Sequence, residues 1–130
     1  MPNYDGTRFD PPAPLALVTL SNPKSGANQS DVPMLIDSGA DVTLVPKVCA
    51  ETLGISADPH KRYEIVALDG STSFAQVVQL DLMFLNCLFR GRFLLIDQEW
   101  GILGRNVLNA VSIPLDGPHL VWSEQGFRPD

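Results

Sequence analysis

The first half of the chain alternates short apolar runs with segments rich in turn-forming residues. Ser21–Ser30 is dense in Asn, Pro, Gly and Ser and is therefore predicted to be a loop. Pro46 precedes a helix-like stretch, Lys47–Leu53, which Gly54 closes. Three apolar runs have the length of β-strands: Leu15–Leu20, Val32–Ile36 and Val42–Val45.

The second half contains longer runs with a two-residue period. Tyr63–Leu68 leads into Asp69-Gly70-Ser71-Thr72, a turn signal of the kind that joins two antiparallel strands. The following run, Phe74–Leu85, separates apolar from mostly polar positions. One face carries Val78, Leu80, Leu82 and Phe84, and the other carries Gln79, Asp81 and Met83. This pattern predicts a long β-hairpin with one buried face.

The remaining pattern extends the sheet and adds a helix. Leu88–Leu95 alternates again after a reversal near Asn86-Cys87. Residues from Ile102 are predicted to open a short amphipathic helix that runs to about Val111, and His119–Trp122 a last short strand. We therefore expect an all-β fold, a closed barrel or sandwich with one or two short helices.

Length and composition limit the domain organisation. The chain has 130 residues and a mass of 14.2 kDa, which is the size of one domain. Hydrophobic residues make up 45% and charged residues 18%, so the chain can bury a core and is not disordered. We expect a folded domain over residues 15–123, preceded by a loose arm of residues 1–14 and followed by a tail of residues 124–130.

Charge and cysteine content exclude several classes of function. The net charge of -6 makes the chain a poor candidate for binding the phosphates of nucleic acid, and weakly disfavours acidic substrates. The two cysteines are too few for a disulfide framework and lack the spacing of zinc ligands. No apolar run has membrane-spanning length, and the first residues show no signal-peptide pattern. We expect a cytoplasmic domain, either alone or within a longer protein.

The sharpest chemical feature is Leu35-Ile36-Asp37-Ser38-Gly39-Ala40. An apolar strand leads an aspartate directly into a turn of small residues, where Ser38 can hydrogen-bond locally and Gly39 lets the backbone approach a partner closely. Such a turn holds a carboxylate in a fixed, partly desolvated position. Taken alone, the tetrapeptide fits an ordinary Asx-turn at the end of a strand equally well.

A second feature, Trp100-Gly101-Ile102-Leu103-Gly104-Arg105-Asn106, follows later in the chain. In this order the two features resemble the retropepsin family, the retroviral-type aspartic proteases, over roughly residues 15–123. Asp37-Ser38-Gly39-Ala40 matches the D-[ST]-G-A sequence of that family. Ile102-Leu103-Gly104-Arg105-Asn106 matches its element of two hydrophobic residues followed by G-R-[DN].

The resemblance implies a role for each residue of the first motif. Asp37 would be the catalytic aspartate, and Ser38 would lock two catalytic loops together across a dimer axis. Gly39 would let these loops approach each other. Ala40 and Asp41 would help to hold the backbone of the substrate.

The resemblance also assigns residues elsewhere in the chain. Arg105 would pair with Asp41 and, with Asn106, support the catalytic loop. Ile102 and Leu103, with Ile36, would face the substrate and favour hydrophobic side chains beside the cut. Asp69-Gly70-Ser71 would form the tip of a flap, with only one glycine where retroviral flaps are glycine-rich. Leu120-Val121-Trp122 would be a strand at the dimer interface.

One aspartate per chain determines the expected assembly. An aspartic protease needs two carboxylates close enough to share one proton, and a water that they activate attacks the peptide bond. The chain has one D-[ST]-G sequence, at Asp37, so the second carboxylate would come from a second copy by two-fold symmetry. We therefore expect a homodimeric endopeptidase that acts on polypeptides and needs no metal and no cofactor.

Other chemistries fit these residues less well. Asp37 and Asp41 form a D-x-x-x-D pair, but Gly39 breaks the aspartate spacing of phosphatase metal sites. Ser38 lacks the G-x-S-x-G surroundings of a nucleophile, the two histidines stand in turns, and the two cysteines stand in apolar settings. A catalytically weak or inactive retropepsin-like dimer that serves as a binding or assembly module stays open as the alternative. Such a module, however, has no chemical need for the Asp37 carboxylate.

Overall fold

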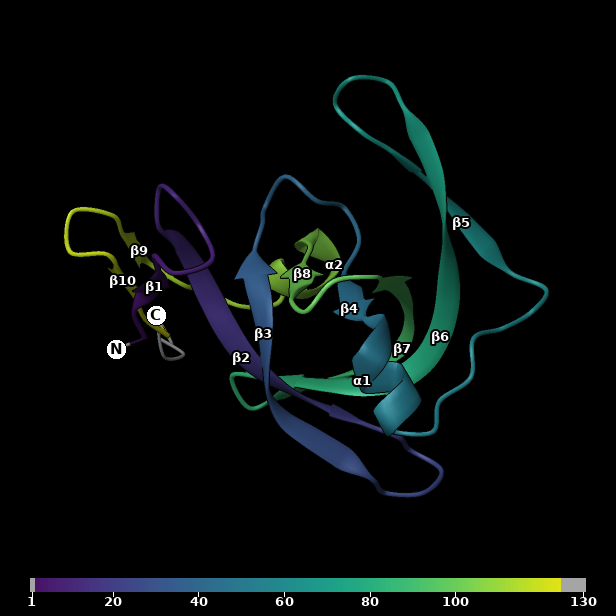
Figure 1. The fold of residues 1–130 in the computed structure, drawn as a ribbon. Helices are drawn as coiled ribbons and strands as arrows, with labels where there is room; N and C mark the ends of the chain where they lie inside the picture. Colours follow the sequence, from purple (N-terminus) through teal and green to yellow (C-terminus); the bar gives the residue numbers. More distant parts are fainter. Residues whose placement is uncertain (1, 125–130) are drawn as a thin grey trace.

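The computed structural model describes residues 2–124 and is built mainly of strands, with two short helices (Figure 1). This confirms the all-β expectation. The elements in chain order are β1 (Tyr4–Asp5), β2 (Ala13–Ser21), β3 (Asn28–Ile36), β4 (Leu44–Pro46), α1 (Lys47–Thr52), β5 (Arg62–Val66), β6 (Thr72–Phe84), β7 (Cys87–Ile96), β8 (Gly101–Leu103), α2 (Arg105–Leu108), β9 (Leu115–Asp116) and β10 (Val121–Trp122).

The main sheet closes on itself. Its strand order is β1-β2-β3-β8-β4-β7-β6-β5, and β2 pairs in addition with β6. The strands from β2 through β3, β8, β4 and β7 to β6 therefore form a closed ring, while β5 pairs only with β6. Closure leaves fewer unpaired strand edges, which is how small β-domains avoid edge-to-edge association.

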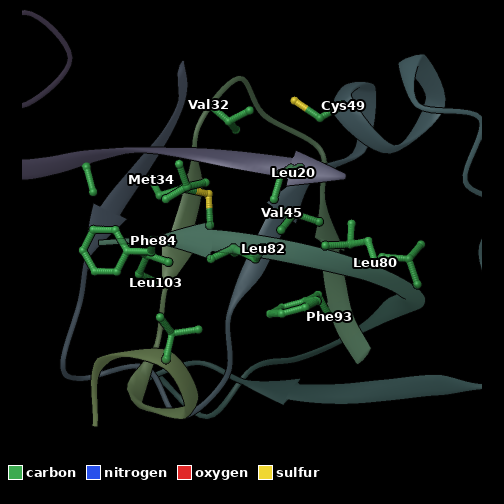
Figure 2. Close-up of a cluster of buried hydrophobic side chains, with 14 of the residues drawn as sticks. Leu20, Val32, Met34, Val45, Cys49, Leu80, Leu82, Phe84, Phe93 and Leu103 are labelled. Carbon is green, nitrogen blue, oxygen red and sulfur yellow. The ribbon is translucent and has the colours of Figure 1, made fainter. Parts of the chain in front are cut away.

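The core fills the interior of this ring (Figure 2). The face of β6 predicted to be buried is buried: Val78, Leu80, Leu82 and Phe84 are each at most 3% exposed. They pack with side chains from β2, β3, β7 and β8, among them Leu20, Met34, Phe93 and Leu103. A smaller cluster of Leu44, Ala75, Val77 and Leu94 joins β4 and β7 to the N-terminal half of β6.

Two predicted segments differ in the structure. β3 begins at Asn28, so Ser21–Ser30 contributes residues to two paired strands and only its centre is a turn. Ile102 and Leu103 belong to β8, and the second helix is limited to Arg105–Leu108. Ile102 and Leu103 are extended because β8 pairs in parallel with the end of β3. Such a contact between segments far apart in the sequence leaves no mark in the local pattern of residues.

The N-terminal residues were expected to form a loose arm, yet they are paired. β1 pairs with β2, and the Tyr4 amide donates to the carbonyl oxygen of Leu120 across 2.7 Å. The Trp122 amide donates to the carbonyl oxygen of Pro2 across 3.0 Å. The arm is thus held by the end of the domain. The predicted tail lies outside the described residues beyond Glu124.

The last strand, β10, has a neighbour on both sides within its own chain. Val121 pairs with Asp116 of β9 on one side and with Asn3 on the other. The Trp122 side chain is 3% exposed, and its indole N–H donates to the carbonyl oxygen of Leu15. In the described chain, β10 therefore offers no free edge to a dimer partner, and the expected dimer strand does not have the arrangement predicted for it.

Among residues 2–124, no helix has both the length and the apolar character needed to cross a lipid bilayer.

Candidate active site

The end of β3 delivers Asp37 into a tight turn. Its amide donates to the carbonyl oxygen of Leu103 on the neighbouring strand β8 across 3.1 Å, which fixes the backbone where the strand ends. The Ala40 amide then closes the turn on the carbonyl oxygen of Asp37, also across 3.1 Å. The parallel β3–β8 pairing thus sets the position from which the aspartate side chain projects.

The Asp37 carboxylate is anchored through one of its two oxygens. Oδ1 accepts a hydrogen bond from the Gly39 amide at 2.9 Å, and within residues 2–124 the other oxygen, Oδ2, has no hydrogen-bonding partner. The side chain is half-buried, between the exposed turn and the core below it. A side chain at position 39 would crowd this oxygen, because its Cβ would lie 3.1 Å from Oδ1. The turn therefore orients the carboxylate and leaves Oδ2 available.

The second motif meets the first at this turn. The Arg105 guanidinium donates to the carbonyl oxygen of Ser38 across 2.8 Å, and the Arg105 amide donates to the carbonyl oxygen of Ala40, also across 2.8 Å. The predicted ion pair between Arg105 and Asp41 is not formed among the described residues. Arg105 instead supports the turn at Asp37 through main-chain oxygens, because the turn presents the carbonyl groups of Ser38 and Ala40 toward the start of α2.

A buried threonine joins the two segments a second time. The Thr43 hydroxyl donates to Oδ1 of Asn106 across 2.6 Å and accepts from the Gly104 amide at 3.0 Å. Thr43 is 1% exposed and its bond from the Gly104 amide is buried, whereas the bond to the exposed Asn106 is partly buried. Asn106 was expected to support this loop, whereas a contribution from Thr43 was not predicted. The available signal was a hydroxyl residue inside an otherwise apolar run, Val42-Thr43-Leu44-Val45.

Gly104 is required by close packing where the segment that leads into α2 crosses the segment that follows Asp37. A Cβ at this position would lie 2.2 Å from the carbonyl oxygen of Val42. Its φ of -92° is open to any residue, so the constraint is the space available and not the backbone conformation. The chain following Asp37 and the chain leading into α2 can cross this closely only because the side chain is a hydrogen.

Ile102 and Leu103 lie on opposite faces of β8. Leu103 is fully buried in the main core, so the expectation that it faces the substrate is wrong. Ile102 is half-buried and packs against the smaller cluster beside β6. Alternate residues of a strand point to opposite sides of the sheet, so at most one of the pair can face the substrate.

The predicted flap is the hairpin of β5 and β6, which projects beyond the closed ring (Figure 1). At its tip Gly70 has a φ of +86°, a conformation that favours glycine. Oδ1 of Asp69 accepts from both the hydroxyl and the amide of Ser71, at 2.6 and 2.9 Å, and these bonds lower the pKa of the Asp69 carboxyl. Asp69, Gly70 and Ser71 thus form a self-contained turn that makes no hydrogen bond to Asp37 among residues 2–124.

Three apolar side chains of the hairpin are exposed. Val66, Leu68 and Phe74 are 65%, 110% and 62% exposed. Exposed apolar side chains that gather on one element are candidates for contact with another chain.

Other candidate chemistries find little support in the described residues. Within residues 2–124, no three His, Cys, Asp or Glu side chains gather closely enough to hold a metal ion. Cys49 is buried in the core, and desolvation raises the pKa of its thiol, which disfavours the reactive thiolate. His119 is exposed and lies 2.9 Å from Asp116, on the turn between β9 and β10. The clearest chemical arrangement is therefore the turn at Asp37.

Comparison with known proteins identifies the arrangement. A family model described as "gag-polyprotein putative aspartyl protease" matches residues 25–110, more than half of the chain. Among solved structures, the chain resembles the EIAV protease complexed with the inhibitor HBY-793, with a TM-score of 0.56 and 19% identity, over 75% of this chain and 86% of that one. None of the curated proteins compared with the chain matches it.

The family model spans both motifs, and the structural likeness shows the fold. The retropepsin fold predicted from the sequence is thereby confirmed. In this chain the turn Asp37-Ser38-Gly39 at the end of β3 is tied to Gly104-Arg105-Asn106 by hydrogen bonds. The chain belongs to the retropepsin-like aspartic proteases.

Proposed function

We propose that the protein is an aspartic endopeptidase whose active site is made by two copies of Asp37, one from each subunit of a homodimer. The observation that carries this proposal is the state of the Asp37 carboxylate, which the Gly39 amide orients through Oδ1 while Oδ2 has no partner among the described residues. One chain supplies one such carboxylate. A two-fold axis beside the turn supplies the second.

The proposed chemistry follows from the proximity of two carboxylates. Two such groups in contact cannot both ionise, so the pair holds one proton. The ionised member accepts a proton from a bound water, whose oxygen attacks the carbonyl carbon of the peptide bond. The protonated member donates its proton to the carbonyl oxygen. The carboxyl that took the proton of the water then gives it to the amide nitrogen, and a hydroxyl group of the tetrahedral intermediate returns its proton to the other carboxylate as the carbon–nitrogen bond breaks, without a covalent enzyme intermediate.

Residues around Asp37 would position the second subunit and the substrate. Ser38 and Gly39 are exposed at the turn, where the loops of two subunits would meet, and the Ser38 hydroxyl has no partner within residues 2–124. Ala40 and Asp41 follow at the rim, where they would bond an extended substrate backbone. The β5–β6 hairpin, with Asp69, Gly70 and Ser71 at its tip, would close over the substrate and exclude water.

The proposed dimer contact would not be made by an unpaired edge of β10. Both sides of β10 are covered by Asn3 and β9 of the same chain. The proposal therefore assigns the contact near the axis to the exposed turn at Ser38 and Gly39. It predicts that activity and dimer fraction fall together on dilution, because a separated subunit has half of the catalytic pair.

The test is cleavage of a diverse peptide library from about pH 4 to 7, a range suited to a carboxylate pair that shares a proton. The wild type is compared with Asp37→Asn, and Asp31→Asn is the matched control on the same strand. We expect cleavage by the wild type and the control only. No cleavage by a folded, dimeric wild type would favour the binding or assembly module. Equal cleavage by the wild type and Asp37→Asn would contradict the proposal.

A further inference from the structure

A cavity of about 380 Å³ lies beside the catalytic turn. On one side it is lined by Val42 and Thr43, which directly follow the catalytic loop, and by Asn106, the neighbour of Arg105. On the other side it is lined by residues 60–63, which lead into the flap strand β5. A chain bound between the flap and Asp37 would therefore pass its mouth.

The wall of this cavity is positively charged although the protein is acidic. Lys61, Arg62 and Arg92 line it together with His60, and no carboxylate lines it within residues 2–124. The whole chain has nine Lys and Arg residues and a net charge of -6, so one third of its cations gather at one hollow. A hollow lined by one sign of charge attracts the opposite charge more strongly than the net charge of the protein indicates.

Two of these cations are available to a ligand. Lys61 and Arg92 have no ion pair with any described residue. Arg62 is partly engaged, since its guanidinium lies 5.0 Å from the centre of the Phe74 ring on β6. By contrast Arg90, two residues before Arg92 on β7, lies 3.7 Å from Asp81 and does not line the cavity.

A neighbouring hollow extends the positive wall. It has a volume of about 440 Å³, shares Lys61 and Arg92 with the first, and adds Lys24. Its one carboxylate, Asp58, accepts a hydrogen bond from the His60 amide at 2.9 Å. Lys61 and Arg92 thus stand between two cavities, and neither forms an ion pair with a described carboxylate.

The inner surface of the first cavity is apolar, since Val42, Val77 and Leu94 line it. A side chain with an aliphatic stem and a charged end would match both parts, with its methylene groups against these residues and its carboxylate at the cations. We propose that this cavity is a substrate subsite that selects an acidic side chain, Glu or Asp, of the bound peptide. This inference rests on the proposed protease function and names part of its specificity.

The test uses a positional-scanning library of octapeptides in which each position is fixed in turn as Glu or as its neutral isostere Gln. Cleavage by the wild type is compared with that by the double variant Lys61→Gln/Arg92→Gln, and Arg90→Gln is the control. We expect one position at which Glu is cleaved about fivefold faster than Gln, as for a single partly exposed ion pair. The double variant removes this preference, the control keeps it, and raising the salt concentration reduces it.

Measurements of peptide binding distinguish the proposed acidic subsite from the proposed protease function. Asp37→Asn, with and without the double substitution, is applied to the same peptides as an array, so that selectivity is measured without hydrolysis. Cleavage with equal rates for Glu and Gln at every position overturns the acidic subsite and leaves the protease. Absence of cleavage, with Glu-selective binding that Lys61→Gln/Arg92→Gln abolishes, overturns the protease and supports an acidic-peptide site. A preference for Glu that survives the double variant also overturns the assignment.

Discussion

The Arg105 guanidinium donates a hydrogen bond to the main-chain oxygen of Ser38 across 2.8 Å, and so ties α2 to the turn that carries Asp37. Arg105→Ala removes this bond without touching the catalytic carboxylate. Because the side chain is exposed, we expect a loss of about 1 kcal/mol in the free energy of unfolding and a lower dimer fraction. Urea unfolding and sedimentation measure the two quantities.

Arg90→Ala is the control, because Arg90 is also exposed and has only a long contact of 3.7 Å with Asp81. It is expected to change stability by less than about 0.5 kcal/mol. An Arg105→Ala variant as stable, dimeric and active as the wild type would show that the bond to Ser38 does not support the turn.

Thr43 connects Asn106 and Gly104 through one hydroxyl group. Thr43→Val keeps the shape of the side chain but leaves the buried Gly104 amide without a partner. We expect unfolding to become easier by about 1–3 kcal/mol, the cost of an unsatisfied buried polar group. Thr52→Val on α1 is the control, since its hydroxyl bonds the Val48 carbonyl at the exposed surface. Equal unfolding midpoints in urea for both variants would contradict this account.

Gly104→Ala tests the close crossing of the two segments. The added Cβ would lie 2.2 Å from the Val42 carbonyl oxygen, so one segment has to shift. We expect a loss of about 1–3 kcal/mol, as for an overpacked core, together with a loss of activity because the turn at Asp37 moves. Gly117→Ala adds the same methyl group with nothing within 4 Å and is expected to be neutral. Thermal unfolding of both variants gives the comparison.

The flap turn depends on pH through Asp69. Its pKa lies below the usual value of 3.8 because the carboxylate accepts bonds from Ser71. A lowered pKa in the folded state means that the bonds stabilise the turn above about pH 4 and are lost as the pH falls through the folded pKa. Ser71→Ala removes the hydroxyl bond and raises the pKa toward its usual value. Titration of the Asp69 carboxyl carbon by NMR measures this, and an identical pKa in both proteins would contradict it.

Part of this structure can be read from the sequence by periodicity. Val78 to Phe84 alternate strictly, and this local pattern predicted both a strand and its buried face. Ile102 and Leu103 were assigned to a helix, but the three residues of β8 are extended because they pair with β3 and β4, both more than fifty residues away in the sequence. Local patterns do not contain such pairings.

In the candidate site, too, some features can be predicted from the local sequence and others depend on contacts between distant segments. Asp37-Ser38-Gly39 and Gly104-Arg105-Asn106 were recognisable because their residue types and order are specific. The hydrogen bond from Arg105 to Ser38 could not be predicted from the sequence. The folded shape of the turn determines which carbonyl group faces the guanidinium. The positive cavity was also invisible. Lys61 and Arg92 are ordinary surface cations in the sequence and meet only when β5 and β7 lie on either side of β6.

The central claim is that each active site needs two Asp37 residues. Wild type and Asp37→Asn are refolded together in equal amounts, so that subunits combine at random, and peptide cleavage is compared with that of wild type refolded with Asp31→Asn. If both carboxylates are required, only pairs of wild-type subunits cleave, and activity per total protein falls to about one quarter. A fall to about one half would mean that each subunit works alone and would contradict the shared site.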